Sequence, residues 1–598
     1  MTSKYPERPT VFNDNSYRFD NFDDGKYILG KKNGLLPAMG WNSWNAFGSG
    51  NTEALTIAMA DKIKELKLDE LGYKYVVLDD GCYKPERVNG ELSNEETKFP
   101  HGFRFLSDYL HEKGLKFGMY NDIGTNLCAG AEVGTCGHEA TDAASYLKWG
   151  IDFIKVDNCY YLWDNATFSN AENARYVFTP AIRSIKIGAY TDKVFSATEE
   201  GKIRGNGIEI RDDHVRNIGT FDGTGPMHSP VYLRSGELTF DVYMKTAGEY
   251  NLFVEYASGR KEGCGNWLQV AINNSEGTSY WYDDLLKETA STTEFEWSEA
   301  IPIQFAEGVN TIRLMNHRRQ ENTLASYATL SEELYKQDPG NEILLSICEW
   351  GKTQPQNWGK KVGNSWRILN DITFCVGSDG DPGKGNWKSD YTTGVTSQYN
   401  KAVVMDEFAG LDKGWNDPDM MMIGMNGLTD TMNETHMAMW CMLNSPLMLG
   451  LDLRRVEKGD KIYNVIANKE LIALNQDALG IQAKRIFSTL EKDRPDTEYI
   501  TNIDRVDILA KPLSDNSVAL SFINVSEADK NEGYRTDVET IIKFIGPKMV
   551  NADAFKNAKS YGVKDLFTGE TTTSNDGVFK VSSLKACGNV TLRISVND

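Results

Sequence analysis

The first part of the chain alternates short apolar runs with stretches that have helical spacing. Residues 75–80 (YVVLDD), 115–122 (LKFGMYND) and 153–158 (FIKVDN) are apolar runs that end in acidic or amide side chains. Residues 53–71 place Met59, Ile63 and Leu66 on one face of a helix that we expect to stop at Gly72. Strands that alternate with helices in this way predict parallel βαβ units.

The pattern changes near residue 165. Residues 165–322 contain short alternating strand-like runs separated by turn signals, which is typical of an antiparallel β-sandwich. This segment is far too long for a loop, so we interpret it as an inserted domain. The βα pattern then resumes, with a helix expected over 326–337 and further strand-like segments at 343–350, 365–372, 415–424 and 445–453.

Together with residues 37–41, the chain has eight strand-like segments, four on each side of the insertion. Eight strands close a (β/α)8 barrel, and active sites of such barrels lie at the carboxyl ends of the strands. From about residue 480 the chain is β-rich again, which predicts a C-terminal antiparallel β-sandwich. We therefore expect an α/β (TIM-barrel) protein with these domains: 1–164 and 323–479, the two halves of the barrel; 165–322, the inserted sandwich; and 480–598, the C-terminal sandwich.

The charge balance narrows the classes of partner. The 598 residues include 64 basic and 85 acidic side chains, a net charge of -21. This argues against a nucleic acid or an anionic membrane as partner, because both are bound by basic surfaces. No apolar stretch is long enough to span a bilayer. The first twenty residues have no apolar core of a signal peptide, which leaves an intracellular protein and one whose leader was removed as alternatives. The oligomeric state is open.

Acidic side chains gather where the predicted strands end, with aromatic side chains beside them. Metal and nucleotide motifs such as HExxH, paired CxxC and a Walker loop are absent from the sequence. A barrel mouth rich in carboxylates and aromatics points to glycoside hydrolysis, which needs only two carboxyl groups. The acids are Asp79, Asp80, Asp122, Asp157, Glu349, Asp371, Asp417 and Asp419, and the aromatics are Trp41, Trp44, Tyr120, Trp350, Trp366 and Trp415.

Eight short motifs, in order along the chain, resemble glycoside hydrolase family 27, the α-galactosidase family. They cover both halves of the predicted barrel and the start of the C-terminal domain, but not the insertion. The motifs are MGWNSWN (39–45), LDD (78–80), GMYND (118–122), KVDNC (155–159), SICEWG (346–351), GNSWRILNDI (363–372), GWNDPDM (414–420) and LNQDALGIQ (474–482).

The resemblance implies a retaining exo-glycosidase with Asp157 as nucleophile and Asp371 as general acid/base. We expect Lys155 to lower the pKa of Asp157, and we expect burial beside that nucleophile to raise the pKa of Asp371. The two carboxyl groups of a retaining enzyme should lie about 5–5.5 Å apart. Read alone, Asp157 could equally form a structural pair with Lys155, and Asp371 could cap a helix.

The same resemblance assigns the sugar contacts. It implies that Asp79 and Asp80 bind the 4- and 6-hydroxyls, that Lys155 and Arg367 bind substrate, and that Trp44 stacks on the sugar. Tyr120, Glu349 and Trp350 complete the expected pocket, with Glu349 near a free 2-hydroxyl. These assignments favour terminal α-D-galactosides of an oligosaccharide or glycan. A β-L-arabinopyranosidase or another family 27 exo-glycosidase is the first alternative, and a non-catalytic glycan-binding protein is the second.

Two departures from the family pattern concern the barrel mouth. The family usually reads DDCW, whereas this chain reads LDDGCY with Gly81 inserted and Tyr83 in place of Trp. The cysteine that usually follows WNSWN is missing, so we expect Cys82 to lack its family partner. Cys128 and Cys159 match a second family disulfide that would brace the nucleophile loop.

Within the insertion, residues 170–177 (NAENARYV), 247–259 (AGEYNLFVEYASG) and 306–316 (AEGVNTIRLMN) together resemble a carbohydrate-binding module of the family 35 or family 6 type. Those modules often hold a structural calcium, and the resemblance places Glu172 among its ligands. Trp267 and residues 280–284 (YWYDD) offer aromatic faces for sugars, or they simply fill a sandwich. We expect no cofactor for catalysis.

Overall fold

The computed structural model covers the barrel, most of the insertion and the C-terminal domain. The described residues are 34–124, 126–159, 177–178, 180–204, 209–216, 218, 237–258, 265–266, 268–272, 286–287, 289–291, 293–315, 318–340, 342–351, 355–373, 375–388, 394–489 and 504–597.

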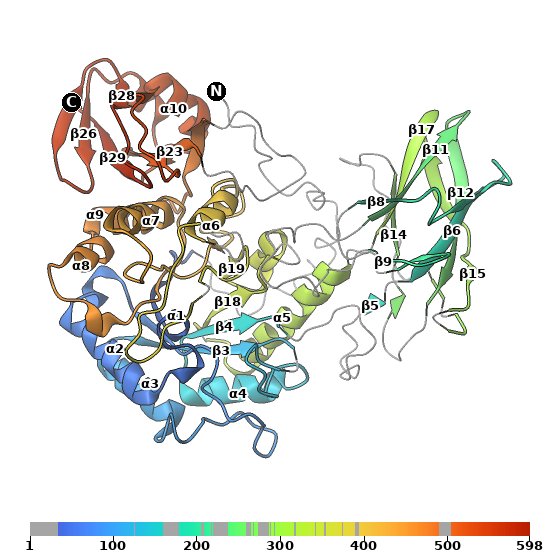
Figure 1. Cartoon of the computed structure of the whole chain (residues 1–598), viewed down its shortest axis with the longest axis horizontal. Coiled ribbons are helices and arrows are strands. Elements are labelled where there is room, and N and C mark those ends of the chain that lie inside the picture. The colour runs from blue at the N-terminus through green and yellow to red at the C-terminus, as the bar shows by residue number, and fades with distance from the viewer. Residues whose placement is uncertain are drawn as a thin grey trace.

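Eight parallel strands form one sheet in which each strand pairs with its neighbours in chain order. The two remaining edges meet at a parallel bridge between Met421 and Leu449, where Met421 N donates to Met448 O at 2.8 Å. The sheet is therefore a closed barrel, as predicted (Figure 1). Its strands are β1 (Met39–Asn42), β2 (Tyr75–Val77), β3 (Lys116–Asp122), β4 (Phe153–Asp157), β18 (Leu344–Cys348), β19 (Ser365–Arg367), β20 (Trp415–Asp417) and β21 (Leu447–Leu449).

Helices surround the barrel (Figure 1). The predicted helix after β1 is shorter than expected, because Lys67 adopts a left-handed φ of 58° and a 3-10 turn follows at Asp69–Leu71. Met59 and Ile63 are buried, as their spacing predicts. The helices are α1 (Ser43–Phe47), α2 (Glu53–Glu65), α3 (Gly102–Glu112), α4 (Glu139–Trp149), α5 (Arg318–Gln337), α6 (Val395–Ala402), α7 (Asp430–Met442), α8 (Lys461–Ile466) and α9 (Lys469–Asn475).

The insertion after β4 contains two antiparallel sheets around their own apolar core, which includes Ile185, Phe240, Leu252 and Ile312. In one sheet, β6 (Ala181–Gly188) and β12 (Gly248–Ala257) pair in the centre with β7 (Val194–Ser196), β9 (Glu209–Ile210), β10 (Val215–Arg216), β15 (Glu296–Trp297) and β16 (Ile301–Phe305) around them. The other sheet holds β8 (Lys202–Arg204), β11 (Glu237–Met244), β14 (Gln269–Ile272) and β17 (Gly308–Met315), and β5 (Val177–Phe178) pairs with β13 (Gly265–Asn266).

The C-terminal domain is a second antiparallel β unit that packs against the barrel. Leu509 and Ile523 on its central strands share one apolar cluster with barrel residues, whereas Ile508 and Phe522 belong to the domain's own core. Its strands are β22 (Lys484–Ser488), β23 (Val506–Pro512), β24 (Val518–Asn524), β25 (Tyr534–Asp537), β26 (Tyr561–Asp565), β27 (Thr571–Ser574), β28 (Val578–Val581) and β29 (Asn589–Val596), with helices α10 (Val538–Ile545) and α11 (Ala552–Lys556).

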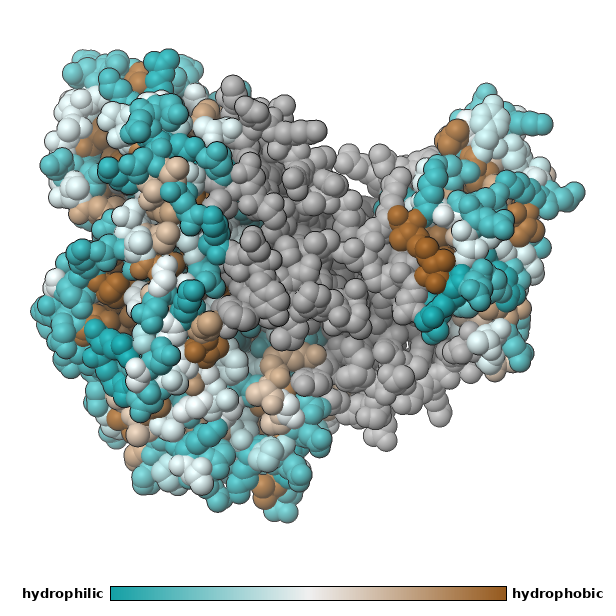
Figure 2. Space-filling model, in the orientation of Figure 1, coloured by the Kyte–Doolittle hydropathy of each residue, from teal (hydrophilic) through white to brown (hydrophobic). Residues whose placement is uncertain are grey.

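The described surface in Figure 2 is mainly hydrophilic, with small separate hydrophobic areas. Within the described part of the chain, no helix has the length and apolar character needed to cross a bilayer. The exact domain boundaries stay predictions.

Candidate active site

The acids singled out in the sequence meet at one end of the barrel, because each follows or ends a parallel strand. Asp122, Asp157 and Asp417 are the last residues of β3, β4 and β20. Asp79 and Asp80 follow β2, Glu349 follows β18 and Asp371 lies four residues after β19. The carboxyl ends of parallel strands share one rim, so the sequence order brings these groups together.

Asp157 is buried, with 5% of its surface exposed. Burial raises the pKa of its carboxyl to about 6, against the opposing effect of the Lys155 ammonium. The sequence led us to expect a lowered pKa, but desolvation outweighs the cation here. Its Oδ1 has no hydrogen-bond partner among the described residues. A buried acceptor of this kind is costly unless a substrate supplies a partner for it.

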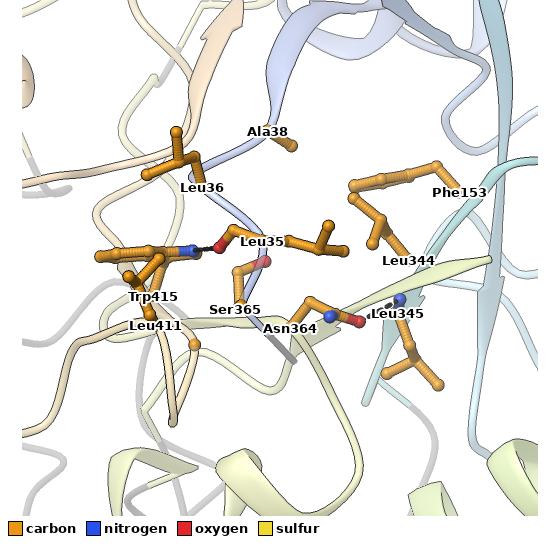
Figure 3. A pocket seen from close by; sticks show the side chains of 12 residues that line it. Leu35, Leu36, Ala38, Phe153, Leu344, Leu345, Asn364, Ser365, Leu411 and Trp415 are labelled. Atoms are coloured by element: carbon orange, nitrogen blue, oxygen red, sulfur yellow. Dashed lines mark hydrogen bonds between the residues drawn. The ribbon is translucent and has the colours of Figure 1, made fainter. Parts of the chain in front are cut away.

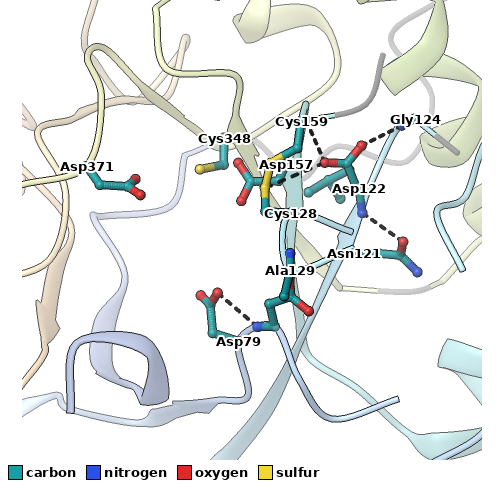
Figure 4. Close-up of a disulfide and its surroundings, with 12 residues drawn as sticks. Asp79, Asn121, Asp122, Gly124, Cys128, Ala129, Asp157, Cys159, Cys348 and Asp371 are labelled. Carbon is teal, nitrogen blue, oxygen red and sulfur yellow. Dashed lines mark hydrogen bonds between the residues drawn. A yellow bond between two sulfur atoms is a disulfide. The ribbon is translucent and has the colours of Figure 1, made fainter. Parts of the chain in front are cut away.

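Asp371 follows β19, which is separated from the strand of Asp157 only by β18, and the two carboxyl groups point toward one another in Figure 4. Arg367 Nη2 donates to Asp371 Oδ1 at 3.0 Å. The Asp371 side chain is 44% exposed, so it is less desolvated than we expected from the sequence. The barrel therefore supplies one buried and one half-exposed carboxyl group.

Lys155 does not pair directly with Asp157 but with Asp79. Its Nζ lies 2.8 Å from Asp79 Oδ2, which also accepts a hydrogen bond from Asn42 Nδ2 at 2.8 Å. The surrounding carboxylates raise the pKa of Lys155 in spite of its burial, so it stays charged. Its ammonium also lies 5.4 Å from the centre of the Tyr120 ring.

Asp80 is positioned by the backbone of a neighbouring loop. Ala129 N donates to Asp80 Oδ2 at 2.7 Å, while Oδ1 is buried without a hydrogen-bond partner among the described residues. Burial, with Asp79 beside it, raises the pKa of Asp80 to about 6. A buried acceptor without a donor is costly unless a ligand supplies one.

Arg367 is buried and fixed by Asp419, which the sequence places among the acids of the barrel mouth without assigning it a contact. Its Nη2 lies 2.8 Å from Asp419 Oδ2, and that oxygen also accepts a hydrogen bond from Ile372 N. Asp419 has a left-handed φ of 78°. The WNDPDM motif could have indicated this role, because Asp419 follows β20 by two residues.

The other expected contacts lie on the same rim. Glu349 is fully buried, and Trp350 is half-buried with a left-handed φ of 60°. Trp44 lies in α1 and is half-buried. Its backbone N–H donates to the side-chain oxygen of Asn42, which caps the helix. Sequence analysis did not single out Asn42, which both caps α1 and binds Asp79.

The predicted disulfide between Cys128 and Cys159 is present, with 5.2 Å between the Cα atoms (Figure 4). Cys159 N donates to Asp122 Oδ2 at 2.6 Å, so the disulfide and Asp122 together hold the start of the loop after β4. These three residues have metal-like spacing, but both sulfurs are used in the disulfide. Cys82 is a buried free thiol, as the missing partner cysteine predicts.

Two cavities lie along the barrel axis. One of about 360 Å³ lies inside the barrel, and Asn42, Lys155, Arg367 and Asp417 contribute polar groups to its wall. The other, of about 390 Å³, is mostly apolar and lies where the strands begin (Figure 3). The second cavity is therefore at the opposite end of the barrel from the acids.

The features expected of the insertion as a binding module lie outside the described residues. These are Glu172, Trp267 and residues 280–284. The calcium and the sugar contacts of the insertion stay predictions.

Comparison with known proteins relates both parts of the chain outside the insertion to one family. The family model described as "Alpha galactosidase A" matches residues 36–192 and 305–477, more than half of the chain. The model described as "Alpha galactosidase C-terminal beta sandwich domain" matches residues 504–594.

Two curated relatives are similar over most of their length. Alpha-galactosidase A of Cellvibrio japonicus is 26% identical over 94% of this chain and 92% of its own. Alpha-galactosidase 2 of Arabidopsis thaliana is 27% identical over 83% of this chain and 77% of its own.

Solved structures share the fold. That of the Saccharomyces cerevisiae α-galactosidase with raffinose has a TM-score of 0.58 at 19% identity, covering 94% of this chain and 98% of that one. That of a family 27 β-L-arabinopyranosidase from Geobacillus stearothermophilus has a TM-score of 0.53 at 14% identity, covering 94% and 96%. With the family models and the curated relatives, the chain belongs to the α-galactosidase family, glycoside hydrolase family 27, and is a glycoside hydrolase.

Proposed function

We propose that the protein is a retaining exo-α-galactosidase in which Asp157 is the nucleophile and Asp371 the general acid/base. The observation that carries the proposal is that the carboxyl groups of Asp157 and Asp371, which belong to strands two apart in the barrel, point toward one another. One is buried with a free oxygen, and the other is half-exposed where a leaving group could depart. Two carboxyl groups facing a sugar are sufficient for glycoside hydrolysis.

In the first step, an Asp157 oxygen forms a bond to the anomeric carbon while the bond from that carbon to the leaving oxygen breaks. The proton on Asp371 moves to the leaving oxygen. With a pKa of about 6, Asp157 is mostly ionised at pH 7 and therefore able to attack.

In the second step, Asp371 takes a proton from water, and the water oxygen attacks the anomeric carbon. The ester bond to Asp157 breaks, which returns its carboxylate and releases the sugar in the α configuration. The exposed face of Asp371 lets water reach it in this step.

The sugar specificity that we propose is for galactose at the non-reducing end. Asp80 Oδ1 is a buried acceptor that a sugar hydroxyl would satisfy, and Lys155 and Asp79 form a charged pair beside it. A site built to bind a hydroxyl discriminates strongly against an analogue that lacks it. Relatives named α-galactosidase support this reading. A β-L-arabinopyranoside, which lacks the hydroxymethyl group, is the alternative substrate.

The proposal is tested with Asp157→Ala and Asp371→Ala, assayed on an aryl α-galactoside and an aryl β-L-arabinopyranoside. The exposed Asp108→Ala is the matched control. We expect both site variants to lose at least 10³-fold in kcat. Azide should rescue Asp157→Ala with a β-galactosyl azide as product, and Asp371→Ala with an α-galactosyl azide. Activity of Asp157→Ala within tenfold of the wild type would overturn the assignment.

A further inference from the structure

Cys348 lies beside the proposed nucleophile, although neither the motifs nor the mechanism give it a role. It ends β18 and is the direct register partner of Asp157 on β4. Its thiol is fully buried and lies close enough to the Asp157 carboxyl to lower the pKa of that group. Figure 4 shows the sulfur next to that carboxyl, on the side toward Asp371.

Arg367 decides which role is left for the thiol. Its Nη1 donates to Cys348 Sγ at 3.5 Å, within the longer range that sulfur allows. Arg367 has only donors, so the sulfur is the acceptor of this contact and its own S–H is left for the Asp157 carboxylate. The contacts therefore run in one direction, from guanidinium to thiol to carboxylate.

The same guanidinium also holds the second carboxyl. Its Nη2 donates to Asp371 Oδ1 at 3.0 Å, and the same Nη2 lies 2.8 Å from Asp419 Oδ2. One buried arginine thus contacts Asp371 directly and Asp157 through the thiol of Cys348.

We propose that Cys348 is a positioning residue, whose S–H orients the Asp157 carboxylate and favours its ionised form for attack. This inference rests on the proposed role of Asp157. It assigns to the SICEWG motif a second function, separate from the expected contact of Glu349 with the substrate.

The other groups that act on Asp157 come from each neighbouring strand. Lys155 on β4 lowers its pKa, while Asp371 and Asp79 raise it. Tyr327 on α5 donates to Val156 O at 2.9 Å, and Tyr120 on β3 is buried nearby. Glu349 follows Cys348 directly. Burial is the largest influence, so Asp157 depends on its few donors to remain ionised.

The test compares Cys348→Ala and Cys348→Ser through the pH dependence of kcat/KM. Cys348→Ala removes the donor, so the acidic limb of the profile should move up by about half to one pH unit, and kcat at the optimum should fall about tenfold. Cys348→Ser keeps an O–H donor and should return the limb to within a few tenths of a unit of the wild type. Cys441→Ala, which removes a buried thiol far from the site in α7, should leave the limb in place.

The outcomes separate this inference from the proposed function. An unmoved acidic limb in Cys348→Ala, or an equal shift in the alanine and serine variants, would overturn the role of Cys348 and leave the role of Asp157 intact. Activity of Asp157→Ala close to the wild type would instead overturn the proposed function. If Cys348→Ala proves too unstable to assay, Cys348→Val fills the same space without a donor and should give the same shift.

Discussion

Lys155 Nζ lies 2.8 Å from Asp79 Oδ2, so the cation next to the proposed nucleophile in sequence is paired with a different carboxylate. At longer range this cation lowers the pKa of Asp157, while the negative charge of Asp79 raises it. The charge of Asp79 therefore affects both sugar binding and the ionisation of Asp157.

Asp79→Asn should separate these two effects. The variant keeps the shape of the side chain but removes the charge that raises the pKa of Asp157, and it leaves Lys155 free to lower that pKa. We expect kcat/KM to fall at least 10²-fold, because a charged contact to the sugar is lost, while the acidic limb of the residual activity moves to lower pH. The pH profile with an activated aryl galactoside measures both. A limb that moves to higher pH would contradict the assigned network.

Asp157→Asn should stabilise the folded protein at neutral pH. The folded-state pKa of about 6 lies above the ordinary value of 3.8 for an aspartate. The folded state therefore binds more protons between these values, and stability falls as pH rises through them. Above pH 6 the buried, ionised carboxyl lowers the free energy of unfolding by its full amount, which is ~1.4 kcal/mol for each unit by which the pKa is raised. The amide carries no such cost.

Thermal unfolding at two pH values measures this effect. We expect the Tm of Asp157→Asn to exceed that of the wild type at pH 7, with a much smaller difference at pH 4. The exposed Asp108→Asn serves as a control and should show no such difference. An equal gain at both pH values would mean that ionisation of Asp157 is not the cause.

Gly81, the residue inserted into the LDDGCY segment, should not tolerate a side chain. Its φ is +99°, and a Cβ would lie 2.7 Å from the Cα of Ser49. Gly81→Ala should therefore shift the neighbouring Asp80 and lower kcat/KM at least tenfold. Gly90 has a φ of +84° with open space around it, so Gly90→Ala isolates the backbone strain. Equal activity of the two variants would contradict the close approach at Gly81.

Removal of the disulfide should affect both stability and catalysis. Cys128 and Cys159 are 31 residues apart, and a disulfide that closes such a loop stabilises a fold by roughly 3–4 kcal/mol. The double variant Cys128→Ser/Cys159→Ser should lower Tm and kcat/KM, because Cys159 N positions Asp122 at the end of β3. Dithiothreitol should reproduce the loss of Tm and kcat/KM in the wild type. It should do the same in the control Cys375→Ser, which removes a free and exposed thiol outside the disulfide. Unchanged Tm after reduction would contradict this role.

The sequence predicts the barrel well because its signals are local and repeated. Each strand is a short apolar run, and each acid ends a strand or follows it within four residues, so the shared rim follows from parallel pairing. The disulfide and the free Cys82 also follow from the motifs.

Contacts between side chains across the rim, and the effect of burial on their pKa values, could not be predicted from local sequence patterns. The spacing of Lys155 and Asp157 suggests a pair, but the side chain of Lys155 reaches Asp79 instead, 76 positions earlier. The direction of the Asp157 pKa depends on desolvation, which no local pattern reports. Cys348 contacts Asp157 only because β18 and β4 pair in register across the whole insertion.

The most direct test of the account is the identity of the side chain that bonds to the sugar. A fluorinated α-galactosyl fluoride with slow turnover should accumulate as an ester on the enzyme, and mass spectrometry of the digested protein locates it. We predict the label on Asp157, in the peptide that contains KVDNC, and its absence from Asp157→Ala. A label on another residue, or rapid turnover by Asp157→Ala, would contradict the central claim.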